Sequence, residues 1–148
     1  MGAEFVKSDF SIKDKVHSYY WIDDINCATT LLKTVSEILK IQLSPQVIDS
    51  AIGMHGAGKF GAQCGLVEGS LMLIGIAGRS KKYPDDRIVK NCYRFAEEFQ
   101  KNFGSLNCNT LRPEGFKPEN PPHLCEKLTV EAVEFTENFI KRMSSFID

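Results

Sequence analysis

Apolar residues recur at three- and four-residue steps in several stretches of this 148-residue chain, and this helical spacing constrains the fold more than any other feature. The first such stretch, over about residues 24–41, contains Ile25, Ala28, Leu31, Leu32, Val35, Ile38 and Leu39. No run alternates apolar and polar residues for long enough to form a strand, and no internal repeat is present. The sequence therefore predicts a single all-α domain.

Helix-starting and helix-stopping residues divide the next part of the chain. Ser44 and Pro45 suit the N-cap and the first position of a short helix that runs through Ile52. A glycine-rich loop then covers residues 53–61. An apolar helix is expected from about residue 62 to 76, and its lack of a polar face places it at the centre of the bundle.

Glycines and acidic residues mark the central and fourth helices. Gly65 and Gly69 lie four residues apart, so a neighbouring helix can approach one face of the central helix closely. Gly78 is expected to end that helix. Asp85 or Asp86 is predicted to be the N-cap of the fourth helix, and Gly104 its C-cap.

The two ends of the chain complete a bundle of about five helices. Residues 105–122 contain too many prolines for a helix or a central strand, so a long connection is expected before the last helix. That helix carries Leu124, Leu128, Ala132, Phe135, Phe139 and Met143 at helical steps. Residues 1–20 are predicted to be an N-terminal extension, in part a possible expression tag, with room for a short extra helix. Residues 21–148 are predicted to form a single helical four-cysteine domain.

Charge and hydropathy exclude several functions. The 18 basic residues are balanced by 19 acidic ones, so nucleic acid is not expected as the main partner. The longest apolar stretch, residues 66–78, is interrupted by Glu68 and Ser70 and is too short to span a membrane. The first five residues lack the start of a signal peptide. We therefore expect a cytoplasmic protein, in which structural disulfides are rare.

The chain has five cysteines, although a domain of this length folds without disulfides. If consecutive helices pack antiparallel, the first, third and fifth helices start at the end of the bundle where the fourth stops. Cys27, Cys64 and Cys125 fall in the first turns of those three helices, and Cys108 lies just after the fourth. These four are predicted to meet at one end, whereas Cys92 is expected to pack in the core, about 16 Å away.

Such a cluster suits two kinds of chemistry. A helix N-terminus favours a thiolate and can lower a cysteine pKa to about 3.5–7.5. Thiolates attack disulfides and also bind soft metals, so the cluster could work as a dithiol–disulfide pair without cofactor, or hold zinc or an iron–sulfur centre. Cys64, beside the flexible glycines, is the expected attacking thiol. The alternative is that the cysteines pack as small hydrophobic residues.

Other motifs carry weaker signals. His123, two residues before Cys125, could complete a mixed metal site or could be an ordinary loop histidine. Residues 56–61 match the GxGxxG dinucleotide fingerprint, but a helix rather than a strand precedes them, so a loop near the cysteines is favoured. Glu68 could accept a proton near Cys64 or could simply be solvated. No CxxC motif is present, which excludes a thioredoxin-type site and an ordinary zinc ribbon.

Four segments together resemble the C_GCAxxG_C_C family of redox-active proteins. They are Asn26-Cys27-Ala28, Gln63-Cys64-Gly65-Leu66-Val67-Glu68-Gly69, Phe103-Gly104-Ser105-Leu106-Asn107-Cys108 and His123-Leu124-Cys125-Glu126. The resemblance covers roughly residues 20–142, with one departure: Leu66 stands where the motif has alanine. It implies that Cys27, Cys64, Cys108 and Cys125 are the functional set. Because genes of this family often lie beside transporter genes, a transporter-linked protein is a candidate for the unknown redox partner, but the resemblance implies no substrate.

The preferred hypothesis is a small redox protein in which these four cysteines exchange disulfides or hold a redox-active metal. Such a protein could be a thiol-dependent oxidoreductase. A non-catalytic zinc or iron module is the rival hypothesis, and a partner-binding helical domain with inert cysteines is a third. The aromatic residues would also allow a homodimer interface.

Overall fold

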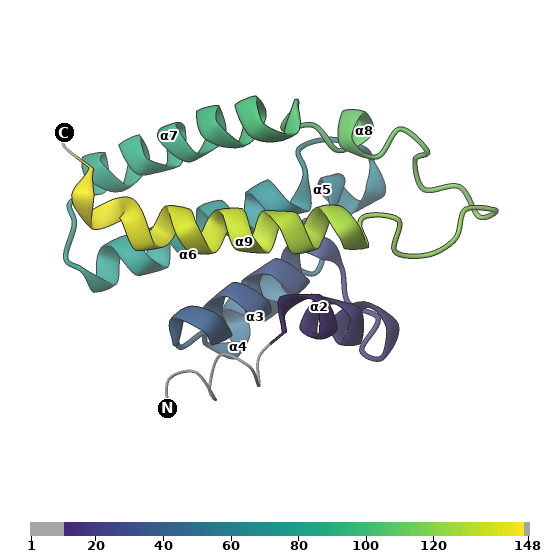
Figure 1. The fold of residues 1–148 in the computed structure, drawn as a ribbon, viewed down its shortest axis with the longest axis horizontal. Coiled ribbons are helices and arrows are strands. Elements are labelled where there is room, and N and C mark those ends of the chain that lie inside the picture. The colour runs from purple at the N-terminus through teal and green to yellow at the C-terminus, as the bar shows by residue number, and fades with distance from the viewer. Residues whose placement is uncertain (1–10, 147–148) are drawn as a thin grey trace.

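The computed structural model describes residues 11–146, and most of that part of the chain is helical (Figure 1). It contains eight α-helices, five of them with seven or more residues, and no strand. The all-α prediction is confirmed, but the helices number eight instead of about five. The long helices are α2 (Ile12–Trp21), α3 (Cys27–Leu39), α6 (Gly65–Ser80), α7 (Asp85–Phe103) and α9 (Glu126–Arg142). The short ones are α4 (Pro45–Ser50), α5 (Gly56–Lys59), α8 (Cys108–Leu111) and the 3-10 turn Met143–Ser145.

Helix α6 is the central element of the bundle, as its apolar sequence predicted. It packs against α3, α7 and α9. Figure 1 shows α6, α7 and α9 running lengthwise, with α2 and α3 below α9, on the side away from α7. Leu66, Val67, Leu73 and Ile74 of α6 are fully buried. A helix that is apolar nearly all round needs neighbours on most of its surface. The neighbours of α6 bury most of it, and Leu71, Met72 and Ile76 on the remaining side are half-buried.

The close approach of α3 to α6 depends on glycine, as the Gly65–Gly69 spacing predicted. A Cβ atom at Gly69 would lie 2.9 Å from the carbonyl oxygen of Ala28 on α3. Real Cβ atoms do not approach backbone oxygen that closely, so only glycine allows this helix contact.

Phenylalanine rings fill the space between α7 and α9. Phe95 and Phe99 of α7 and Phe139 of α9 are fully buried. The ring of Phe95 meets those of Phe139 and Phe135 edge to face, with centroids 5.2 and 5.6 Å apart. Such edge-to-face pairs add to the stabilisation from burial alone.

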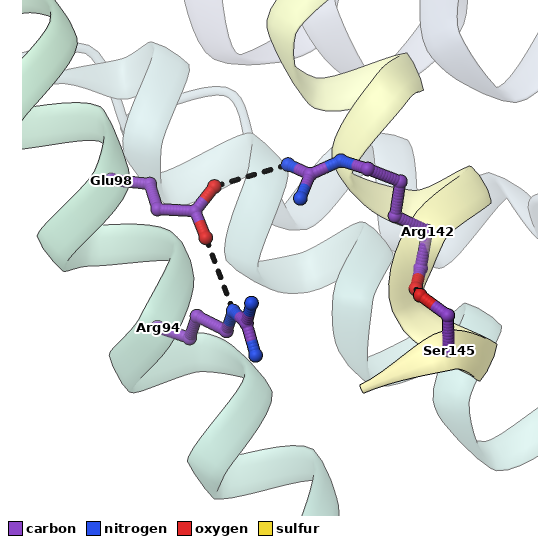
Figure 2. Close-up of polar contacts among 4 residues, drawn as sticks. All are labelled: Arg94, Glu98, Arg142 and Ser145. Atoms are coloured by element: carbon purple, nitrogen blue, oxygen red, sulfur yellow. Dashed lines mark hydrogen bonds and ion pairs between the residues drawn. The ribbon is translucent and has the colours of Figure 1, made fainter. Parts of the chain in front are cut away.

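An ionic contact joins α7 to α9 near the C-terminal end of α9 (Figure 2). Glu98 accepts hydrogen bonds from Arg142 at 3.0 Å and from Arg94 at 3.1 Å. Partial burial of Glu98 acts to raise its pKa, but the two arginines outweigh this effect and hold the pKa below its usual value.

Helix α2, within the stretch expected to be an N-terminal extension, is packed into the bundle. Val16 and Tyr20 are buried, and the Tyr20 hydroxyl lies 2.6 Å from Thr129 Oγ1 on α9. Trp21 also donates a hydrogen bond to Glu126 at 2.7 Å. The possible extra helix of the first twenty residues is therefore present, whereas residues 1–10 and 147–148 lie outside the described part of the chain.

Two predicted boundaries, at the end of α6 and the start of α7, were wrong. Gly78 does not end α6, which continues to Ser80; the turn is completed by Lys82 in the left-handed conformation (φ 62°). A Cβ at Gly78 would lie 2.8 Å from Ile88, so this glycine admits α7 instead of stopping α6. Pro84, not Asp85 or Asp86, occupies the N-cap of α7. Gly104 is its left-handed C-cap, as predicted.

The proline-rich connection was predicted to contain no helix, but it begins with one turn, α8. Asn107 caps this turn by accepting a hydrogen bond from the Asn109 amide at 2.9 Å. Its prolines all come after the turn, so they do not disturb it.

Candidate functional site

The four predicted site cysteines line one cavity in the structure. Cys27 is the first residue of α3, Cys64 is the N-cap of α6, Cys108 is the first residue of α8, and Cys125 is the N-cap of α9. All four carry free thiols. Cys92 packs partly buried against the core and is not among the cavity residues, so the division into four and one agrees with the sequence argument.

The cavity has a volume of about 610 Å³, within the range of sites that take small molecules. It lies where α3, α6 and α9 begin, and the connection after α8 forms one of its sides. Most of the wall is apolar and includes Ile25, Ile52, Leu66, Leu111 and Phe116. Leu66, the residue that departs from the family motif, is thus part of this wall and is fully buried.

Asn26 fixes the position of Cys27. Its side-chain oxygen accepts a hydrogen bond from the Thr29 amide at 2.8 Å, which caps α3. Its amide nitrogen donates to the carbonyl oxygens of Ala51 and Ile52, at 3.0 and 2.7 Å. The residue before the first cysteine therefore joins the start of α3 to the end of the α4 segment.

Two glycines make room for the sulfur atoms. A Cβ at Gly65 would lie 2.5 Å from Cys27 Sγ, and one at Gly56 would lie 2.9 Å from Cys108 Sγ. Gly56 also has a left-handed backbone (φ +70°). The glycine-rich segment therefore brings its backbone close to the cysteines, as predicted, and it is preceded by helix α4 instead of the strand that a dinucleotide fold requires.

Two backbone hydrogen bonds bring the second and third cysteines into adjacent segments. The Cys64 amide donates to the Leu106 carbonyl at 2.8 Å, and the Cys108 amide donates to the Ala62 carbonyl at 2.7 Å. Gln63 and Asn107 form an isolated antiparallel bridge between them. This pairing also explains why α6 begins at Gly65 and not at residue 62 as expected.

The thiol pKa values are raised, which contradicts the expected lowering at helix N-termini. Burial raises the pKa of Cys64 to about 12, although the Leu66 and Val67 amides act to lower it. Burial, followed by the charges of the other three cysteines, raises the pKa of Cys27 even further. The helix termini are present as predicted, but burial in a shared apolar cavity outweighs them.

The raised pKa of Cys64 predicts a stability loss in alkaline solution. The folded protein holds this proton up to about pH 12, whereas the unfolded chain releases it from about pH 9. The contribution is therefore complete below about pH 9 and is lost as the pH rises through that window. At about pH 10.5 the loss of stability amounts to roughly 2 kcal/mol.

Denaturant unfolding at about pH 8 and about pH 10.5 measures this effect. The free energy of unfolding should fall less between the two pH values in Cys64→Ala than in the wild type, by about 2 kcal/mol. Cys92→Ala is the matched control and should keep most of the wild-type pH dependence. Equal losses in Cys64→Ala and the wild type would contradict the assigned pKa.

Arg112, which the sequence analysis missed, is the cation next to the cysteines. Burial raises the pKa of both Cys125 and Cys108, and the Arg112 guanidinium acts in the opposite direction on both thiols. Stacking on the Phe116 ring, 4.1 Å from its centroid, and a 2.8 Å hydrogen bond to the Gly115 carbonyl hold the guanidinium in place. Its position four residues after Cys108 was the available sequence signal.

The other candidates have partners of their own. His123 lines the cavity, but its Nε2 lies 3.1 Å from an Asp24 oxygen and its ring stacks on Tyr20. His55 accepts a hydrogen bond from Asn26, and burial together with the charge of Lys59 lowers its pKa. Glu68 accepts a hydrogen bond from Gln63 and does not line the cavity.

The donor arrangement does not fit a metal centre as it stands. In residues 11–146, no three or more His, Cys, Asp or Glu side chains are placed so that they could hold a metal ion. A closed zinc site needs four ligands within about 2.3 Å of one atom. The thiols as they lie therefore do not form a zinc or iron–sulfur site.

Comparison with known proteins assigns the chain to a family. The family model described as "Putative redox-active protein (C_GCAxxG_C_C)" matches residues 25–139, more than half of the chain. The chain belongs to this family. The match spans all four cavity cysteines and Arg112, and it confirms the resemblance seen in the sequence. No curated protein and no solved structure matches the chain.

No helix among the described residues is long and apolar enough to cross a membrane. This agrees with the absence of a membrane span expected from the sequence.

Proposed function

We propose that the protein cycles between a dithiol and a disulfide, with Cys125 as the attacking thiol and Cys108 as the resolving thiol. The observation that carries this proposal is the position of Arg112 in the wall of the same cavity, where its charge acts to lower the pKa of both Cys125 and Cys108. A thiolate, not a thiol, attacks a disulfide, so the cysteine beside a fixed cation is the better nucleophile. Cys64, the attacker expected from the sequence, is more deeply buried and has a pKa of about 12.

The proposed exchange transfers two electrons. The Cys125 thiolate attacks one sulfur of an oxidised disulfide, forms a mixed disulfide and releases the first partner thiol. Cys108 loses its proton and attacks Cys125 Sγ, which forms the Cys108–Cys125 disulfide and releases the second partner thiol. A dithiol reductant reverses both steps. As part of the proposal, this cycle takes place in the cytoplasm, with a redox partner that remains to be identified.

Cys27 and Cys64 fit the role of a second, inner dithiol. Both line the same cavity, and the Cys64 charge is the first of the three cysteine charges that raise the Cys27 pKa. An inner pair can reduce the Cys108–Cys125 disulfide by exchange and so store a second pair of electrons. All five thiols are free in the structure, so a disulfide forms only after side-chain rotation brings two sulfur atoms together.

Oxidation with diamide, followed by thiol titration and peptide mapping, tests the proposal. One equivalent should remove two of the five thiols and yield mainly the Cys108–Cys125 disulfide, and dithiothreitol should restore both. Cys125→Ser should abolish that product, whereas Cys92→Ser, the matched control, should form it at the wild-type rate. Failure to form any reversible disulfide, or a stoichiometric metal retained after anaerobic purification, would overturn the proposal.

A further inference from the structure

We infer that the cavity beside the cysteines binds small anionic molecules, and that the oxidised substrate is a low-molecular-weight disulfide carrying negative charge. This substrate class rests on the proposed thiol exchange. The binding preference itself rests on charge placement in the cavity, which is independent of redox chemistry.

The cavity lining carries more positive than negative charge, although the whole chain has a net charge of −1. Lys33, Lys59 and Arg112 line it, and Asp24 is the one carboxylate among the lining residues. Asp24 is already paired with His123 at 3.1 Å. Within residues 11–146, none of the three cations forms a salt bridge with a carboxylate.

The backbone adds to the same preference. Helices α3, α6 and α9, with 13, 16 and 17 residues, all begin at the cavity, so their positive dipole ends face it. The apolar wall strengthens these charge interactions, because it keeps the effective dielectric constant below that of water. An anion that enters therefore meets unpaired cations and helix N-termini next to the thiols.

The volume and chemistry then limit the substrate. A cavity of about 610 Å³ accommodates a small molecule whose apolar part contacts the wall. Its anionic group would bind near Arg112 and Lys59, and its disulfide would lie against Cys125. The reaction converts one anionic disulfide and the protein dithiol into two small thiols and the protein disulfide, so electrons and protons balance.

Alkylation with two reagents of similar size tests the binding preference without any redox step. Iodoacetate is an anion and iodoacetamide is neutral. A thiolate displaces iodide from either reagent and becomes carboxymethylated or carboxamidomethylated. The iodoacetate-to-iodoacetamide rate ratio at Cys125 should exceed that at Cys92 by about fourfold or more at low salt, because Cys92 lies outside the cavity. High salt should reduce the difference.

Charge-neutralising variants make this test specific. Arg112→Gln alters the Cys125 thiolate for both reagents alike, so the ratio isolates the attraction of the anion. Lys59→Gln and Arg112→Gln should each lower the ratio about fourfold, whereas Lys90→Gln, on the exposed start of α7, should not change it. A ratio at Cys125 equal to that at Cys92 would overturn the inference.

Two disulfides of opposite charge then test the substrate class. Glutathione disulfide is anionic and cystamine is cationic, and Lys59→Gln should lower the ratio of their oxidation rates by about fourfold. If diamide forms the protein disulfide but this ratio is unaffected by Lys59→Gln, the substrate class is wrong and the dithiol function stands. If diamide also forms no disulfide, the dithiol function fails, and the alkylation ratio still decides the anion preference.

Discussion

Phe95→Ala is expected to lower the free energy of unfolding by about 3–5 kcal/mol, the largest effect predicted for a single substitution in this protein. Phe95 is fully buried and its ring meets Phe99, Phe135 and Phe139 at centroid distances of 5.8, 5.6 and 5.2 Å. Because these rings lie between α7 and α9, the substitution leaves a cavity between the two helices. Denaturant titration measures the loss.

Tyr93→Ala is the matched control for Phe95→Ala. Tyr93 lies on the same helix, but 70 % of its surface is exposed, so its removal should change stability by no more than about 0.5 kcal/mol. Phe95→Leu should fall between the two, since it keeps part of the buried volume. A Phe95→Ala protein as stable as Tyr93→Ala would show that the aromatic cluster does not hold α7 against α9.

Gly65→Ala is expected to destabilise the protein by about 3 kcal/mol and to displace the Cys27 thiol. The added Cβ would lie 2.5 Å from Cys27 Sγ and 2.7 Å from the Met54 carbonyl oxygen, with the Ala28 amide at 3.2 Å. Two of these three neighbours are backbone atoms, so relaxation must separate α6 from α3. Stability by denaturation and the alkylation rate of Cys27 by iodoacetamide measure the two consequences.

Gly75→Ala, on the same helix, is the matched control for Gly65→Ala. No atom lies within 4 Å of the Cβ position at Gly75, so alanine there should stabilise α6 by about 0.5–1 kcal/mol through its higher helix propensity. Cys27 reactivity should remain at the wild-type level. If Gly65→Ala behaves like Gly75→Ala, then the close contact between α3 and α6 is not required.

The long helices could be predicted because their signals are local. Periodic apolar residues predicted α3, α6, α7 and α9, and Gly104 marked the end of α7 correctly. Gly78 shows where this reasoning fails. A glycine late in a helical pattern is typical of a C-cap. Here Ile88 packs so close to Gly78 that there is no room for a side chain, and no local pattern contains that information.

The candidate site was predictable in its cysteines but not in its electrostatics. The predicted helix starts placed Cys27, Cys64 and Cys125 at one end of the bundle. In the structure these three cysteines and Cys108 line one cavity. The spacing of Arg112 four residues after Cys108 was too weak a signal to predict its role, because an arginine at the start of an irregular proline-rich connection belongs to no periodic pattern. Its contact with Cys125 depends on how that connection folds back past α8.

The sequence by itself determined the all-α fold, the family and the grouping of the cysteines into four and one, because periodicity, capping residues and cysteine order are properties of neighbouring positions. Only the tertiary structure decided the chemistry available to the four thiols. Burial in a shared cavity raises their pKa values against the helix dipoles, and the fixed cation distinguishes Cys125 from Cys64. Desolvation and through-space charge depend on residues far apart in the chain, so they exist only once the chain has folded.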